Sequence, residues 1–235
     1  MAPSPVKSVI IFLGSSHIDP EGQRRLADAL EATRPEIILL EVSRFSLIFR
    51  KTIGRLYHHI MERRAVEAGV DMSPELANAL RYLEVPAEYH AAREYRLKTG
   101  SKIILVDVSR FSFRELIHAH EVITRQNIET LSIINADRFA QERAIARRIF
   151  VNGDDALAEM KVRAFGTTSG DDHDHRLAMR EDILTARVIS CMKKFRDRRI
   201  AYVGGWKHCI DDPKGRTLYS RIEEPKERRI VFLEG

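Results

Sequence analysis

Four short runs of apolar residues, rich in β-branched side chains, constrain the fold of this chain most strongly. They span residues 8–13, 36–40, 102–106 and 199–203. Each run is apolar almost without interruption, whereas a strand with one face in water alternates apolar and polar residues. Continuous apolarity is typical of parallel strands that are covered on both faces. A fifth run, residues 229–233, lies near the end of the sequence, and we expect an edge strand there.

Helix signals lie between these runs. Asp19-Pro20 predicts a helix start after the first run, and Ser73-Pro74 predicts another start further on. Gly100 predicts the end of the helix that precedes the third run. Alternating strands and helices predict an α/β fold with a mostly parallel central sheet.

The helical content exceeds what simple connections between strands need. Residues 44–99 and 112–163 contain few helix breakers, so we expect helical insertions that cap one end of the sheet. Residues 166–175 are polar, and we expect a loop there that lies over the site. A chain of 235 residues can bury one sizeable core, so we expect a single domain over residues 1–235.

The composition is that of an ordinary globular protein, with 44% hydrophobic and 31% charged residues. No apolar run reaches the roughly 18 residues of a membrane span, and residues 1–7 lack the pattern of a secretory signal. We therefore expect a cytoplasmic protein with no membrane partner. Cys191 and Cys209 show no metal or disulfide spacing, and we expect both to be reduced. The composition allows a homo-oligomer.

Two motifs occur twice. The stretch IILLEVSRFS, which contains Glu41, recurs as IILVDVSRFS, which contains Asp107. The first run ends in GSSH with His17, and the fourth ends in GWKH with His208. We interpret the chain as two related half-units, each of which contributes a histidine and a strand-end acid.

These four residues predict a site, because ligands of open parallel sheets bind at the carboxyl ends of the strands. Two imidazoles and a carboxylate, from His17, Glu41 and His208, can hold a divalent metal and leave one position open. A water bound there is acidified and can attack a carbonyl carbon. Asp107 could be a fourth ligand, a partner that orients a histidine, or a general base.

Two arginines and one loop are further candidates. Arg44 follows Glu41 by three residues, so it could pair with that carboxylate, receive a developing oxyanion or form a surface salt bridge. Arg180 opens the helix before the fourth run and could clamp an anionic substrate group if it faces the sheet. The loop over the site could supply one residue, Asp172 or His173.

The order of these motifs resembles the TraB/Tiki family, with its PrgY and GumN relatives. The resemblance rests on GSSH at the first run, ILLEVSR at the second, Asp107 after the third, Arg-Glu-Asp in the following helix and VGGWKH at the fourth. It implies an α/β fold of duplicated halves, in a clan with erythromycin-esterase-like and ChaN-like proteins. The Tiki branch is regarded as a divalent-metal-dependent peptidase, which implies His17, Glu41 and His208 as ligands or catalytic groups. Family members often carry secretion signals or membrane anchors, and Trp206 and Lys207 are bulkier than the family's usual residues.

Several functions stay open at this point. The first is a metal-dependent hydrolase that cuts amide bonds of a peptide or small molecule, with Mn, Co or Zn on His17, Glu41 and His208. The second is a metal-free, esterase-like hydrolase in which His17 or His208 is the general base and Glu41 orients it. The third is a module that binds haem or another ligand without turnover. Nucleic-acid binding ranks last, because the net charge of +5 is mild and no aromatic-basic recognition motif accompanies it.

Overall fold

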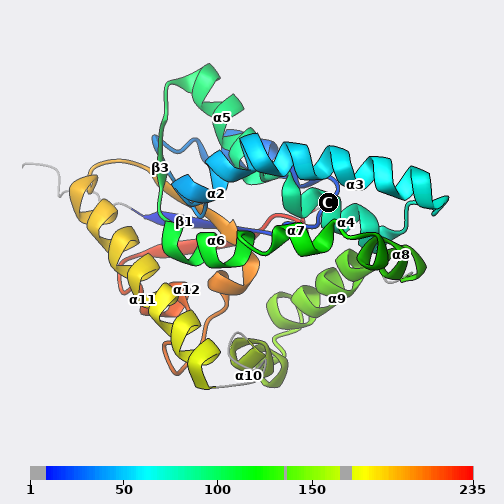
Figure 1. Cartoon of the computed structure of the whole chain (residues 1–235). Coiled ribbons are helices and arrows are strands. Elements are labelled where there is room, and N and C mark those ends of the chain that lie inside the picture. Colours follow the sequence, from blue (N-terminus) through cyan, green and yellow to red (C-terminus); the bar gives the residue numbers. More distant parts are fainter. Residues whose placement is uncertain (1–8, 135–136, 165–170, 235) are drawn as a thin grey trace, which may run out of the picture.

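The fold is α/β, built on one sheet of five strands that all run parallel (Figure 1). The computed structural model describes residues 9–134, 137–164 and 171–234. The strand order is β3-β2-β4-β1-β5. The strands are β1 (Ile10–Ser15), β2 (Ile37–Leu40), β3 (Lys102–Leu105), β4 (Ile200–Gly205) and β5 (Lys226–Ile230). The predicted parallel sheet is confirmed, with β1 to β4 within two residues of the expected positions.

The fifth strand is an edge strand, as expected, but it begins three residues before the predicted run. It pairs with β1 from Lys226 to Ile230, and the last pair joins Ile230 to Gly14, one residue before the end of β1. The apolar residues that suggested a strand at 229–233 lie mostly in the turn that follows, where Val231 and Phe232 are buried. At the edge of a sheet, backbone pairing with the neighbouring strand decides where the strand lies. A search for apolar runs cannot detect that pairing.

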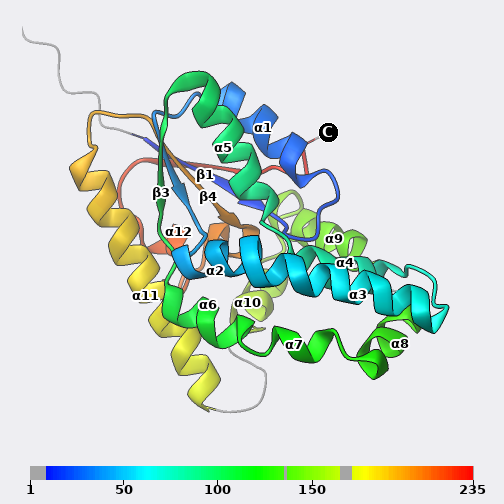
Figure 2. The same cartoon turned by 45° about the horizontal axis from the view of Figure 1, so that its top comes forward.

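Helices cover both faces of the sheet, and this explains the uninterrupted apolarity of the strands (Figure 2). On one face, α1 (Gly22–Thr33) and α5 (Ala87–Thr99) pack on Leu13 and Ile38. On the other, α11 (Asp171–Lys194) and α12 (Leu218–Arg221) pack on Phe12 and Tyr202. Neighbouring residues of one strand therefore enter opposite cores, and both cores require apolar side chains.

The helix signals in the sequence are largely confirmed. The Ser73 hydroxyl caps α4 (Pro74–Leu83) by accepting from the backbone N–H of Leu76, 3.1 Å away. Gly100 ends α5 in the left-handed conformation, with φ of 76°. The helix predicted from Asp19-Pro20 begins slightly later, at Gly22.

The stretches 44–99 and 112–163 are mostly helical where they are described, as expected, with short non-helical connections such as residues 69–73 and 151–154. Most of their helices pack around a third apolar cluster, which contains Met61, Leu76 and Leu116. Within the described parts of the chain, every helix is too short or too polar to span a bilayer. The helices not yet given are α2 (Arg44–Phe49), the π-helix η1 (Arg50–Gly54), α3 (Arg55–Ala68), α6 (Ser109–Leu116), α7 (Ala119–Val122), α8 (Arg125–Ile133), α9 (Arg138–Phe150), α10 (Asp155–Ala164) and the 3-10 helix η2 (Trp206–Cys209).

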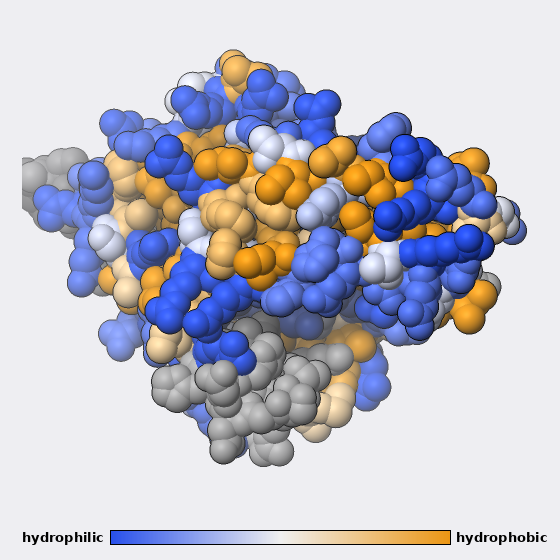
Figure 3. All heavy atoms as spheres, in the orientation of Figure 1, coloured by the Kyte–Doolittle hydropathy of each residue, from blue (hydrophilic) through white to orange (hydrophobic). Residues whose placement is uncertain are grey.

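The outer surface of this cap is only partly polar. Figure 3 shows apolar side chains gathered over α2, α3 and α6, between basic and acidic ones. The exposed apolar residues of these elements and η1 include Ile48, Ile53, Leu56 and Phe113. Some apolar residues of the cap are therefore exposed rather than buried in its core.

The loop expected at residues 166–175 is not a loop over its whole length. Residues 166–170 lie outside the described part of the chain, but residues 171–175 form the start of α11. Acidic residues are favourable in the first turn of a helix, so the aspartates that suggested a loop also suit a helix start. The side chains of Asp172 and His173 lie outside the described structure, and their predicted role stays a prediction.

Candidate functional site

The two repeated motifs lie next to each other in the sheet. Strands β2 and β3 pair, and the helices that follow them, α2 and α6, pack together through Phe45 and Phe113, whose ring centroids are 5.2 Å apart. Strands β1 and β4 also pair, with Ser15 opposite Gly205. From β3 to β1, the residues at the carboxyl edge are therefore Asp107, Glu41, His208 and His17.

Three of the predicted residues converge on Gly205, at the end of β4. A methyl group built on Gly205 would lie 3.6 Å from His208 Cδ2, 3.7 Å from Glu41 Oε2 and 3.9 Å from His17 Nε2. These side chains therefore share one small space. Gly205 keeps that space open, because any side chain there would fill it.

This space is part of a cavity of about 890 Å³ between the sheet edge and the helical cap. Its volume is within the usual range for pockets that bind small molecules. Besides the predicted residues, the cavity is lined by Glu88, Arg50, Arg55, Arg81, Tyr82, Glu115 and Glu142.

Glu41 is buried, and four donors surround its carboxylate. Oε2 accepts from the hydroxyl of Tyr202 at 2.7 Å and from the backbone N–H of Gly205 at 2.8 Å. Oε1 lies 3.1 Å from Arg180 Nη2 and 2.9 Å from His208 Nε2. Burial alone would raise the pKa of Glu41, but His208 and Arg180 outweigh it and hold the pKa well below its usual range. Glu41 is therefore a carboxylate.

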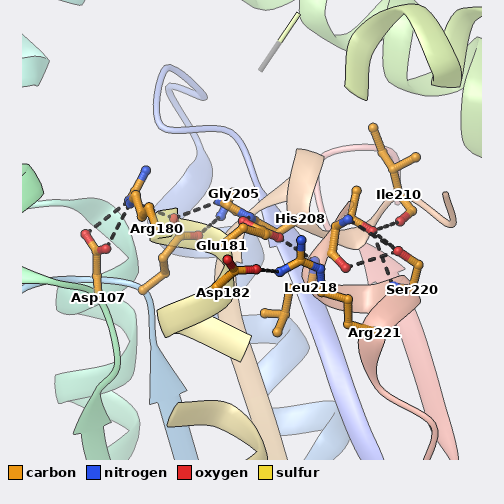
Figure 4. Close-up of polar contacts among 12 residues, drawn as sticks. Asp107, Arg180, Glu181, Asp182, Gly205, His208, Ile210, Leu218, Ser220 and Arg221 are labelled. Atoms are coloured by element: carbon orange, nitrogen blue, oxygen red, sulfur yellow. Dashed lines mark hydrogen bonds and ion pairs between the residues drawn. The ribbon is translucent and has the colours of Figure 1, made fainter. Parts of the chain in front are cut away.

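His208 is held between two carboxylates (Figure 4). Its Nε2 faces Glu41, and its Nδ1 lies 2.8 Å from Oε2 of Glu181. Burial would lower the pKa of His208, but the two carboxylates raise it to about 10. The ring is therefore a buried imidazolium at neutral pH, and both of its nitrogens are occupied.

His17 has a different environment. Its Nδ1 lies 2.6 Å from Oε1 of Glu88, while 60% of its side chain is open to the water of the cavity. The charge of Glu88 raises the pKa of His17 to about 9 and outweighs the partial desolvation of the ring inside the cavity, which lowers the pKa. Burial alone would raise the pKa of Glu88, but His17 and the Ser15 hydroxyl, 2.7 Å away, lower it to about 2. The pair leaves Nε2 of His17 facing the cavity.

Arg180 joins the two strand-end acids. Its Nε and Nη2 lie 3.0 and 3.1 Å from the two carboxylate oxygens of Asp107, and Nη2 also reaches Glu41. Burial would lower the pKa of Arg180, but Glu41 and Asp107 raise it above its usual value. Asp107 therefore binds a guanidinium in this structure. Arg180 lies inside α11 rather than at its start, and it faces the sheet.

The expected role of Arg44 is not supported. Arg44 is exposed in the first turn of α2 and does not line the cavity, and Glu41 pairs with Arg180 instead. Ser43 caps α2 and turns the chain away from the sheet edge, so the next residue points outward. The position of Arg44 three residues after Glu41 in the sequence therefore did not predict a contact between them.

Sequence reasoning missed two acids of the site. Glu88 lies in the first turn of α5, far from any strand end, and only its place two residues after Pro86 indicates a helix start. Glu181 follows Arg180 directly and was part of the same motif. Its contact with His208 depends on how α11 lies on the sheet, which one sequence does not reveal.

The donors present do not fit the predicted three-ligand metal site. Both oxygens of Glu41 and both ring nitrogens of His208 already face protein partners at 2.7 to 3.1 Å, so only Nε2 of His17 remains. A guanidinium beside the carboxylate also opposes a second cation at the same place. Among the described residues, no group of three His, Cys, Asp or Glu side chains is arranged to hold a metal ion.

No protein-family model, curated protein or solved structure matches this chain.

Proposed function

We propose that the chain is a hydrolase that adds water to an ester or amide bond, with His17 as the general base. One observation carries this proposal: a buried carboxylate holds Nδ1 of His17 while Nε2 faces the cavity. A base that is oriented by an acid on its far side, and open on its near side, is the arrangement that activates water or a nucleophile in many hydrolases.

The residues of the site divide the reaction between them. His17 Nε2 takes a proton from water, and the water oxygen attacks the carbonyl carbon. Glu88 stabilises the imidazolium that forms, and that imidazolium returns the proton to the leaving group. Arg180 lines the cavity with its Nη1 free of partners among the described residues, so Nη1 can donate to the developing oxyanion.

Glu41 and His208 act through Arg180 rather than on the substrate. The carboxylate of Glu41 fixes Nη2 of Arg180, and the imidazolium of His208 offsets the negative charge beside it. A preorganised network of this kind aims a donor without reorganisation during the reaction. Both are positioning residues in this scheme.

A panel of chromogenic esters and peptide anilides tests the proposal. The wild-type chain should hydrolyse at least one of them, and His17→Ala should lower kcat/KM by about 10²- to 10⁴-fold, the usual contribution of a general base. His59→Ala is the matched control, because His59 is an exposed histidine of α3 outside the cavity. Equal rates in wild type and His17→Ala would contradict the proposal.

Metal-dependent hydrolysis on His17, Glu41 and His208 is the second candidate. The convergence of these three side chains on Gly205 favours it. It requires Glu41 and His208 to leave their present partners. Elemental analysis of wild type and a His17→Ala/His208→Ala double variant separates the two candidates, together with rates after exhaustive chelation. We expect the wild type to contain no stoichiometric metal and to keep its rate after chelation. Metal that is present in the wild type and lost together with activity in the double variant would favour the second candidate.

A further inference from the structure

One wall of the cavity carries three arginines that form no ion pair with the described residues. Arg50, Arg55 and Arg81 line the cavity from the helical cap. In the described part of the chain, no carboxylate lies within ion-pair distance of any of the three. Arg180, on the opposite side, is bound by two carboxylates.

Arg50 is held in place by neutral groups. Its Nε donates to the backbone carbonyl of Tyr82 at 3.0 Å, and its Nη1 donates to the hydroxyl of Ser46. The guanidinium also lies over the ring of Tyr82, 5.3 Å from the centroid. These contacts orient the guanidinium. Burial lowers the pKa of Arg50, while the charges of Glu115, Glu88 and Asp107 act across the cavity in the opposite direction. Among the described residues none of these carboxylates contacts the guanidinium, and an anion in direct contact with it would offset the cost of burying its charge.

The backbone beneath Arg50 is specialised. Arg50 begins η1, a π-helical turn between α2 and α3, and such turns are frequent at functional sites. Gly54 ends this turn, and a methyl group there would overlap the backbone oxygen of Leu83 at the end of α4. The close approach of η1 to α4 therefore requires glycine, and it brings Arg50 beside Tyr82.

Arg81 lies on the same side of the cavity, close to the general base. Its Nη1 donates to the backbone carbonyl of Ile18 at 3.2 Å, one residue after His17, and to Oδ1 of Asn78 at 2.8 Å. Both acceptors are neutral, as at Arg50. The charge of Arg50 also acts on His17 and lowers its pKa. Both guanidinium groups therefore lie near the reacting end of the cavity.

We propose that Arg50 and Arg81 form an anion subsite, and that the substrate is an ester or amide which also carries a carboxylate or phosphate group. This proposal deepens the proposed function. The claim that the bound anion belongs to a substrate rests on that function, whereas the claim that the two arginines bind an anion does not. Guanidinium groups fixed in orientation recognise planar carboxylates and phosphates through paired hydrogen bonds. The subsite would place the substrate's anionic group on the cap side and its carbonyl beside His17.

Calorimetric titration with glutarate and with inorganic phosphate tests the subsite without any reaction. The wild-type chain should bind at least one of them, and the stronger one identifies carboxylate or phosphate as the natural group. Arg50→Met and Arg81→Met should each weaken that binding about tenfold or more, because each variant removes charge-assisted hydrogen bonds to the anion. Arg44→Met is the matched control, since Arg44 is an exposed arginine of α2 outside the cavity, and it should bind like wild type.

Several results would overturn the subsite. No binding of either anion to the wild type at millimolar concentrations would do so, as would equal affinities in Arg50→Met and Arg44→Met. If Arg50→Met does not fold, Arg50→Lys replaces it. Lysine keeps the charge but loses the paired donors, so Arg50→Lys should bind the anion more weakly than the wild type and Arg44→Met. Thermal unfolding of every variant shows which of them are folded.

The same titration separates the subsite from the hydrolase. His17→Ala should still bind the anion, because it removes the base and leaves both arginines. Anion binding by a chain that cleaves nothing in the panel would refute the proposed function and support the subsite. Hydrolysis of neutral substrates by a chain that binds neither anion would support the proposed function and refute the subsite.

Discussion

Replacing Glu88 by glutamine removes one negative charge from beside His17 and leaves the shape of the side chain almost unchanged. Glu88 is the largest influence on the pKa of His17, which it raises from 6.5 to about 9. Without that charge, desolvation and Arg50 lower the pKa and only Glu41 still raises it, so the pKa should fall from about 9 towards 6.5. The carboxamide oxygen can still accept from the Ser15 hydroxyl.

The two forms should therefore have different pH profiles. In the wild type, kcat/KM should rise with pH through about 9, because only the deprotonated ring accepts a proton from water. At pH 7, a group of pKa about 9 is only about 1% deprotonated, whereas one of pKa 6.5 is about three-quarters deprotonated. In Glu88→Gln, the midpoint should move towards pH 6.5, and the plateau should fall by about 10- to 100-fold because the base is weaker and less well oriented.

The difference between the profiles distinguishes this role from a structural one. Glu88→Gln should lose most activity above pH 9, whereas near pH 7 its larger deprotonated fraction should bring its kcat/KM to about that of the wild type or above it. An NMR titration of the His17 ring gives the same pKa without any substrate. Glu94→Gln, on the exposed side of the same helix, should leave both measurements unchanged. A loss of equal size at every pH, with the His17 pKa unmoved, would refute the reasoning.

The remaining predictions concern packing and charge at the sheet edge. A methyl group on Gly204 would overlap Glu41 Oε2, whereas one on Gly205 would make ordinary contacts, so thermal unfolding should show Gly204→Ala as clearly destabilised and Gly205→Ala as near wild type. Gly205→Ala should nevertheless lose activity on the ester and amide panel, because it fills the space before His17; full activity would contradict that assignment. Arg180→Met should lower the free energy of unfolding by about 3–5 kcal/mol in urea denaturation, since it leaves the buried carboxylate of Asp107 without an ion pair and Glu41 with one cation, His208, in place of two. A change below about 1 kcal/mol would show that these carboxylates become protonated or find water instead.

The sequence predicted the sheet and its carboxyl edge because both depend on local pattern. Continuous apolar runs mark strands that are buried on both faces, and the residue that ends each run must lie at the edge of the sheet. His17, Glu41, Asp107 and His208 were found in this way. Their convergence follows from strand order, since β3, β2, β4 and β1 are consecutive neighbours.

The partners of these residues could not be predicted in the same way. Glu88 reaches His17 across 71 positions of sequence, and it does so only because α5 packs on the same face of the sheet as α1. The pairing of Glu41 with Arg180 rather than Arg44 depends on the direction in which α2 leaves the strand. Contacts that depend on how a helix lies on a sheet leave no periodic signal in a single sequence.

The two histidines show why such partners matter more than the motif. His17 and His208 each follow a strand-end glycine by three residues, and the motif alone gives them the same role. His208 meets two carboxylates in a buried position, so both of its ring nitrogens are occupied and neither can reach a substrate. His17 meets one carboxylate and keeps a nitrogen in the cavity. The number of acids that the helices bring to each ring, rather than the repeated sequence, therefore separates the proposed base from the positioning residue.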